Sequence, residues 1–153
     1  MIGKDSLHLP DAAATEAIGA AIGERLRAGD IVALEGALGM GKTTLARGLL
    51  ASLGLIGEVP SPTFAIVQPY GPPEVRLPVW HVDLYRLEGP GETDELGLDE
   101  VLGDGALLVE WPDRLDGRLL ARALRLSLQE SQEGGRRLTW RTPPAWEERW
   151  PPR

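Results

Sequence analysis

A glycine-rich stretch in the first third of the chain carries the residue types that bind phosphate. Residues 36–43 read Gly-Ala-Leu-Gly-Met-Gly-Lys-Thr and fit the spacing G-x-x-x-x-G-K-[ST]. In this pattern backbone N–H groups curl around an anion, the lysine reaches the β- and γ-phosphates, and the hydroxyl holds Mg²⁺. Lys42 is one of two lysines among 16 basic residues, and a compact ammonium fits this position where a planar guanidinium does not. The predicted nucleotide-binding residues are Gly36, Leu38, Gly39, Met40, Gly41, Lys42, Thr43 and Thr44.

Two acidic residues stand where strand-like segments end. Asp83 closes the segment 77–83 and Glu110 closes 107–110, and an open α/β sheet presents ligand-binding groups at the carboxyl ends of its strands. Phosphoryl transfer needs a second oxygen ligand for the metal, and usually a carboxylate that orients the attacking water. We therefore predict that Asp83 and Glu110 lie near Thr43 and act with Lys42 in catalysis. The alternative for either acid alone is that it caps a strand or pairs with an arginine.

A rigid segment with two hydroxyl groups follows the loop and its helix. Residues 60–63 read Pro-Ser-Pro-Thr, and the two prolines restrict the backbone at low entropic cost. Ser61 and Thr63 are predicted switch residues, with the Thr63 hydroxyl sensing the γ-phosphate as ordered loops do in nucleotide hydrolases. The alternative is a stiff connector with a capping serine.

His81 shares a strand face with Asp83, because alternate residues of a strand point the same way. We interpret it as a structural residue that could orient Asp83, and we do not count it as catalytic. The tryptophans are interpreted as packing residues except Trp111, which directly follows Glu110.

The surrounding sequence predicts the elements that would hold these residues. The expected elements are an edge strand at 6–9, a helix from 10 to 29, a buried strand at 30–35, a helix at 43–53, antiparallel strands at 64–70 and 77–84, a short helix at 96–102, a buried strand at 106–110, and a hairpin of 124–128 with 137–141. Strand, glycine loop and helix follow in the required order, and a helix N-terminus attracts phosphate. The predicted fold is a single α/β domain, a P-loop nucleotide hydrolase-like mixed β-sheet flanked by helices, over residues 1–142. A Pro/Trp-rich tail at 143–153 is expected to be extended.

Composition limits the classes of function. The 153 residues, 42% of them hydrophobic, suit one domain with a sizeable core. No cysteine is present, which excludes disulfides, zinc-thiolate sites and cysteine nucleophiles. The polar start and the lack of a long apolar run predict a cytoplasmic protein with no membrane contact. The net charge of −7 has the wrong sign for gripping nucleic acid unaided, so another subunit would hold any RNA or DNA.

The identity of the nucleotide also follows from the sequence. Guanine-specific hydrolases read the base with N-K-x-D, and this chain contains no asparagine. ATP is therefore the expected nucleotide.

The segment 87–105 holds seven acidic residues and no basic one. It connects the two strands that carry the candidate acids, so we predict that it forms part of a docking surface for a basic partner. The alternative is an ordinary solvated face.

Four segments in this order and spacing resemble the TsaE (YjeE) family. They are 36–44, 61–64 (Ser-Pro-Thr-Phe), 81–86 (His-Val-Asp-Leu-Tyr-Arg) and 109–111 (Val-Glu-Trp). These bacterial ATPases support synthesis of threonylcarbamoyladenosine beside the anticodon of tRNA, and the resemblance spans residues 7–141.

The resemblance implies roles and partners. ATP and Mg²⁺ would be the cofactors, Thr43 and Glu110 would hold Mg²⁺, Asp83 would assist hydrolysis, and 61–64 would act as a switch. The implied partners are TsaD and TsaB family proteins, which perform the transfer onto tRNA, while this subunit hydrolyses ATP to reset the complex and meets tRNA only indirectly.

The chain departs from the family pattern at two loop positions. Ala37 and Met40 replace the usual aspartate and alanine, so no role of that aspartate carries over. Two other functions fit the loop: a small-metabolite kinase, and a nucleotide-gated assembly module in which hydrolysis is not required. The kinase is disfavoured because the segment 87–105, where a basic lid could lie, is entirely acidic.

Overall fold

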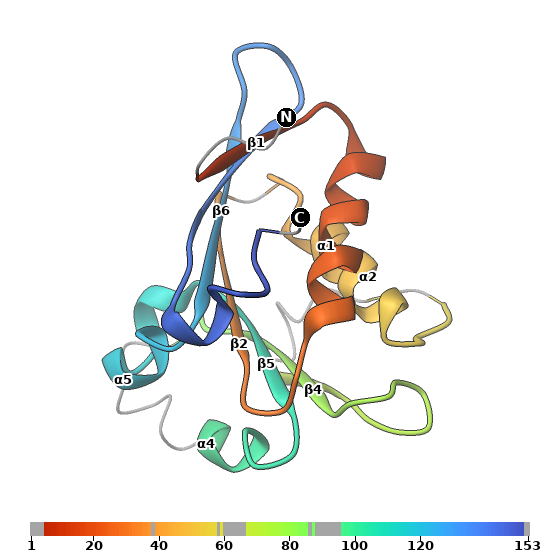
Figure 1. Cartoon of the computed structure of the whole chain (residues 1–153), viewed down its shortest axis with the longest axis vertical. Coiled ribbons are helices and arrows are strands. Elements are labelled where there is room, and N and C mark those ends of the chain that lie inside the picture. The colour runs from red at the N-terminus through yellow and green to blue at the C-terminus, as the bar shows by residue number, and fades with distance from the viewer. Residues whose placement is uncertain are drawn as a thin grey trace.

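The computed structural model describes residues 5–37, 39–57, 59, 67–85, 87 and 96–151. These residues form one seven-stranded mixed sheet with helices packed on its faces (Figure 1), which confirms the predicted single-domain α/β fold. The strands are β1 (Ser6–Leu9), β2 (Ile31–Glu35), β3 (Val67–Tyr70), β4 (Val79–Asp83), β5 (Ala106–Glu110), β6 (Leu124–Glu130) and β7 (Arg136–Arg141). The helices are α1 (Ala12–Arg25), α2 (Lys42–Ser52), α4 (Leu98–Val101) and α5 (Gly117–Leu120), with 3-10 turns η1 (Pro112–Arg114) and η2 (Pro144–Trp146). None of the helices in these ranges has both the length and the apolar character needed to cross a membrane.

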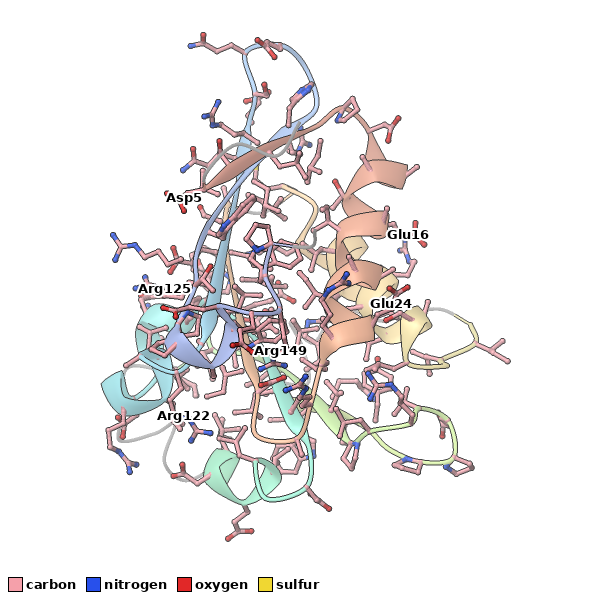
Figure 2. The ribbon with its side chains drawn as sticks, in the orientation of Figure 1. Asp5, Glu16, Glu24, Arg122, Arg125 and Arg149 are labelled. Atoms are coloured by element: carbon pink, nitrogen blue, oxygen red, sulfur yellow. The ribbon has the colours of Figure 1, made fainter. Side chains whose placement is uncertain are left out.

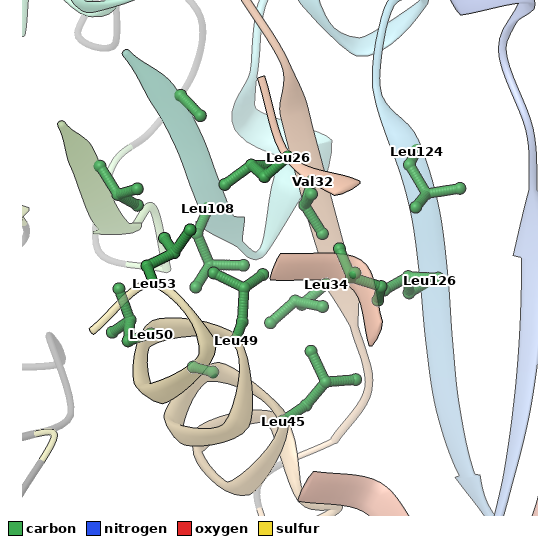
Figure 3. Close-up of a cluster of buried hydrophobic side chains, with 14 of the residues drawn as sticks. Leu26, Val32, Leu34, Leu45, Leu49, Leu50, Leu53, Leu108, Leu124 and Leu126 are labelled. Carbon is green, nitrogen blue, oxygen red and sulfur yellow. The ribbon is translucent and has the colours of Figure 1, made fainter. Parts of the chain in front are cut away.

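The strand order places β2, which leads into the glycine loop, in the middle of the sheet. The order is β1-β7-β6-β2-β5-β4-β3, and β2 pairs in parallel with both β5 and β6. The pairs β3–β4 and β6–β7 are antiparallel, as predicted. The edge strand β1 pairs antiparallel with β7, a partner that the sequence did not indicate. Because both faces of β2 are covered, Val32 and Leu34 enter one core while Ile31 and Ala33 enter the other. Side chains of α2, among them Leu45 and Leu49, fill the first of these cores in Figure 3.

Helix α1 ends earlier than predicted. It was expected to reach Gly29, but it stops at Arg25, because Leu26 takes an extended conformation with ψ of 137°. Leu26 itself remains in the core. The other predicted elements differ from the observed ones mainly at their ends, and residues 64–66 of one expected strand lie outside the described residues.

Helices α1 and α2 approach each other through glycines. A Cβ atom at Gly48 would lie 2.0 Å from the Glu16 carbonyl oxygen, and one at Gly19 would lie 2.0 Å from the Leu45 carbonyl oxygen. No side chain fits at either position without moving a helix. This contact fixes the position of α2, and with it the end of the loop that precedes α2.

We expect Gly48→Ala to destabilise the fold by about 2 kcal/mol, because overpacking outweighs the roughly 1 kcal/mol that alanine adds in helix propensity. The measurement is the free energy of unfolding from urea denaturation. Gly117→Ala is the matched control, since a Cβ there meets open space. A Gly48→Ala protein as stable as its parent would contradict the close helix contact.

The C-terminal segment is not extended as predicted. Residues 143–151 turn back onto the domain through η2, and Trp146 and Trp150 are buried in the first core. Arg149 makes two hydrogen bonds to the carboxylate of Asp30, at 2.7 and 2.9 Å, and stacks over the Trp146 ring. Arg149 also donates to the Arg25 carbonyl, so it joins the C-terminal segment to the end of α1 (Figure 2). The two tryptophans of this segment therefore belong to the core.

Candidate nucleotide-binding site

The phosphate loop, residues 36–43, connects the buried strand β2 to the first turn of α2. Gly36, Gly39 and Gly41 have φ angles of 149°, 80° and 101°, which favour glycine. A Cβ at Gly36 would also lie 2.7 Å from the Leu128 carbonyl oxygen. The loop therefore keeps its path only with glycine at these positions. It ends at the N-terminus of an 11-residue helix, where free N–H groups and the helix dipole favour an anion.

Lys42 lies in the interior of the domain. Its side chain is 6% exposed, and its Nζ has no hydrogen-bond partner among the described residues. The nearest carboxylate oxygen is Oε1 of Glu110 at 3.8 Å, and the Trp111 ring centroid lies 4.4 Å from Nζ. A buried ammonium without a hydrogen bond is costly. The position is therefore suited to an additional oxygen acceptor, which a phosphate group supplies.

His81 forms a hydrogen bond to the second carboxylate oxygen of Glu110. The His81 Nε2–H donates to Oε2 of Glu110 at 2.7 Å, and His81 is fully buried. A carboxylate can only accept hydrogen bonds, so the ring nitrogen is the donor. The predicted link from His81 to Asp83 is therefore replaced by a link to the acid of the neighbouring strand.

Asp83 lies beside Glu110 at the end of the sheet. The two residues are register partners in the parallel pair β4–β5. Their neighbours Val82 and Val109 enter the second core, so strand alternation turns both acids toward the face covered by α2. Asp83 is buried, and its Oδ1 accepts a hydrogen bond from the Tyr85 backbone N–H at 2.9 Å. Each acid ends a strand, as predicted, and the structure shows that the two strands are neighbours. Glu110 lies 3.8 Å from Lys42, the residue before Thr43.

Two aromatic rings cover this end of the sheet. The Trp111 and Tyr85 ring centroids are 4.7 Å apart, with the planes tilted by 46°. Trp111 has a φ of 58°, which re-aims its side chain directly after β5 ends. Tyr85 was not among the predicted site residues, although it stands two residues after Asp83 and is half exposed.

A hollow of about 300 Å³, here called the loop hollow, opens beside the glycine loop. Residues from the start of α1, from the loop and from the β6–β7 turn line it. They are Leu9, Asp11, Ala12, Thr15, Gly39, Gly41, Thr44, Gly135 and Arg136. Arg136 Nη2 donates to the Gly39 carbonyl oxygen at 3.1 Å. Sequence reasoning missed Arg136, because it reaches the loop only through the order of strands in the sheet.

The oxygen donors near the loop suit Mg²⁺. The described residues contain no cluster of three or more His, Cys, Asp or Glu side chains placed to hold a metal ion. Mg²⁺ is commonly bound through one or two carboxylates together with substrate phosphates and waters. The Thr43 hydroxyl and the Glu110 carboxylate match this sparse donor set.

Several predicted features lie outside the described residues: Leu38, the switch residues Ser61 and Thr63, and residues 88–95 of the acidic segment. In the described part of that segment, Asp99 lies 3.7 Å from Arg118 in an exposed ion pair. This portion of the acidic segment therefore has a cation beside it within the same chain.

Comparison with known proteins gives one consistent result. A family model described as "Threonylcarbamoyl adenosine biosynthesis protein TsaE" matches residues 9–138. A Mycobacterium tuberculosis protein named "tRNA threonylcarbamoyladenosine biosynthesis protein TsaE" is 36% identical, covering 92% of this chain and 88% of the relative. Relatives of the same name from Bacillus subtilis and Synechocystis are 37% and 45% identical, over 82% and 70% of this chain and 78% and 69% of theirs.

A solved structure titled "Crystal structure of Bacillus subtilus YdiB" shares the fold. It aligns with a TM-score of 0.74 at 28% sequence identity, over 97% of this chain and 91% of that chain. The likeness therefore extends beyond the matched family segment to nearly the whole chain.

Proposed function

We propose that this chain, which belongs to the TsaE family of tRNA threonylcarbamoyladenosine biosynthesis proteins, binds ATP with Mg²⁺ and hydrolyses it slowly in support of that modification. The observation that carries this proposal is the buried Lys42 Nζ, which has no hydrogen-bond partner among the described residues and lies 3.8 Å from Glu110 at the end of a glycine loop. A phosphate group would satisfy this ammonium.

Each residue of the site has a proposed task. Lys42 and the loop N–H groups bind the β- and γ-phosphates, and the Thr43 hydroxyl and Glu110 hold Mg²⁺. Mg²⁺, when bound, neutralises charge on the phosphate oxygens. Asp83, next to Glu110 in register, orients the attacking water. Trp111 covers Lys42 and helps to keep bulk water from the phosphates.

The loop hollow is the proposed place for adenosine. It begins at Gly39, Gly41 and Thr44, so a nucleotide whose phosphates lie in the loop would reach it directly. Arg136 already binds the loop carbonyl at Gly39 and forms one wall of the hollow. The guanine-reading motif is missing from the sequence, which favours adenine.

The proposed partners are TsaD and TsaB family proteins, with tRNA held by the complex and not by this chain alone. The net charge of −7 supports this division, because an acidic protein has little affinity for a phosphate backbone. We place the reaction in the cytoplasm.

Calorimetric titration of the purified protein tests the proposal. We expect ADP and ATP to bind with Mg²⁺ at least about tenfold more tightly than GDP and GTP, a difference of about 1.4 kcal/mol. Turnover of ATP by the isolated protein should be slow. Equal or tighter binding of GDP would refute the assignment of the adenine nucleotide.

A further inference from the structure

The hydrogen bond between His81 and Glu110 affects the direction in which the Glu110 carboxylate points. Glu110 offers two oxygens, and the structure gives them different neighbours: Oε2 accepts from His81 at 2.7 Å, and Oε1 faces Lys42 at 3.8 Å. All three side chains are buried, with exposed fractions of 0% for His81 and 6% for both Glu110 and Lys42. Solvent therefore screens these interactions weakly.

The contact to His81 is the tighter of the two. At 2.7 Å it has the length of a charge-assisted hydrogen bond, whereas 3.8 Å to Lys42 is an ion pair without a hydrogen bond. When a phosphate binds the Lys42 ammonium, this weaker contact to Glu110 is lost. Among the described residues, the His81 hydrogen bond is then the contact that fixes the Glu110 rotamer. Asp83 does not supply this support, because an ionised carboxylate accepts hydrogen bonds and cannot donate one to Glu110.

Nothing else in the described surroundings uses the His81 ring. Its Nδ1 is buried and has no hydrogen-bond partner among the described residues. A histidine whose polar atoms served only stability would be expected to have both nitrogens satisfied, because an unpaired buried polar atom is costly. Among the described residues, the hydrogen bond to Glu110 is thus the one polar contact of the His81 ring.

We propose that His81 is a positioning residue that holds Glu110 by Oε2, so that Oε1 stays directed at the phosphate loop in both the empty and the nucleotide-bound site. This inference rests on the proposed function, in which Glu110 is a Mg²⁺ ligand. His81 contacts neither the metal nor the nucleotide, and it acts only through Glu110. Removal of a residue that hydrogen-bonds to a metal ligand typically lowers metal affinity or activity about 10- to 100-fold.

The test compares variants at position 81 with a structural control on the same strand. His81→Leu and His81→Asn both remove the donor that reaches Glu110, one with an apolar and one with a short polar side chain, so one of them suffices if the other fails to fold. His81→Gln keeps a side-chain N–H at nearly the length of Nε2. Val79→Ala weakens the packing of β4 two residues away on the same face, without touching the hydrogen bond.

The first readout is the Mg²⁺ concentration at which binding of a slowly hydrolysed ATP analogue reaches half of its maximum, measured by calorimetry and called the Mg²⁺ midpoint. The second readout is the thermal midpoint of unfolding. We expect the Mg²⁺ midpoint to rise about tenfold in His81→Leu or His81→Asn. It should return to within about threefold of the parent in His81→Gln, and Val79→Ala should lower only the thermal midpoint.

In a Glu110→Gln background, His81→Leu should not raise the Mg²⁺ midpoint further, because the two residues act through one interaction. If the donor-removing variants lower the thermal midpoint and leave the Mg²⁺ midpoint at the parental value, His81 is structural and the inference is overturned. A parent protein that binds the analogue with no dependence on Mg²⁺ would instead refute the metal role of Glu110, and the inference with it.

Discussion

Lys42→Ala is expected to weaken ATP and ADP binding about 100-fold, equivalent to about 2.7 kcal/mol. The change removes the one ammonium in the loop, whose Nζ has no hydrogen-bond partner among the described residues and is therefore free to bind phosphate. The fold should survive, because Glu110 keeps its hydrogen bond from His81 when the lysine is gone. Calorimetric titration with Mg²⁺–ADP measures the loss, and urea denaturation checks the fold.

Arg47→Ala is the matched control for this experiment. Arg47 lies in the same helix, α2, five residues after Lys42, but it is exposed whereas Lys42 is buried. Both variants lose one positive charge, so a general charge effect would weaken binding in both. Parental affinity in Lys42→Ala, or equal losses in the two variants, would show that the loop does not bind phosphate through Lys42.

Glu110→Gln is expected to lower the rate constant of ATP hydrolysis about 100-fold, while the affinity for nucleotide changes only a few-fold. The amide has nearly the shape of the carboxylate and can still accept from His81, but it lacks the charge that would hold Mg²⁺. A group that acts mainly on the transition state shows this pattern of lowered turnover with retained binding. Single-turnover hydrolysis with saturating ATP gives the rate, and calorimetry gives the affinity.

Glu35→Gln provides the comparison for Glu110→Gln. Glu35 also ends a central strand next to the phosphate loop, but its carboxylate pairs with Arg125 at 2.8 Å. We expect its turnover to match the parent. Asp83→Asn should reduce hydrolysis as Glu110→Gln does. If Glu110→Gln hydrolyses ATP as fast as the parent, Glu110 is not part of the catalytic machinery.

The sequence predicted the parts of the site that depend on local order along the chain. Strand, glycine loop and helix are consecutive, and Asp83 and Glu110 each end a hydrophobic strand, so their shared edge followed from general rules of parallel sheets. The bond from His81 to Glu110 could not be predicted in the same way. Alternation places His81 on the face of Asp83, but the cross-strand reach of a side chain depends on register and rotamer.

Other features depend on the order of strands or on close packing. Arg136 reaches Gly39 because β7, β6 and β2 follow one another in the sheet, which the sequence does not state. The approach of α1 to α2 depends on Gly19 and Gly48, which look like weak helix residues when only apolar periodicity is counted. The tail was misjudged because its prolines suggested extended chain, while Trp146 and Trp150 fill the core.

A reconstituted tRNA modification assay tests the central claim most directly. The parent or Lys42→Ala would be added to TsaD and TsaB proteins, tRNA and a threonylcarbamoyl donor, with either ATP or a slowly hydrolysed analogue. We predict several rounds of modification per complex only with the parent and ATP, and at most one round with the analogue or with Lys42→Ala. Equal multiple-round yields with Lys42→Ala and ATP would contradict the proposal that ATP hydrolysis at this loop supports the modification.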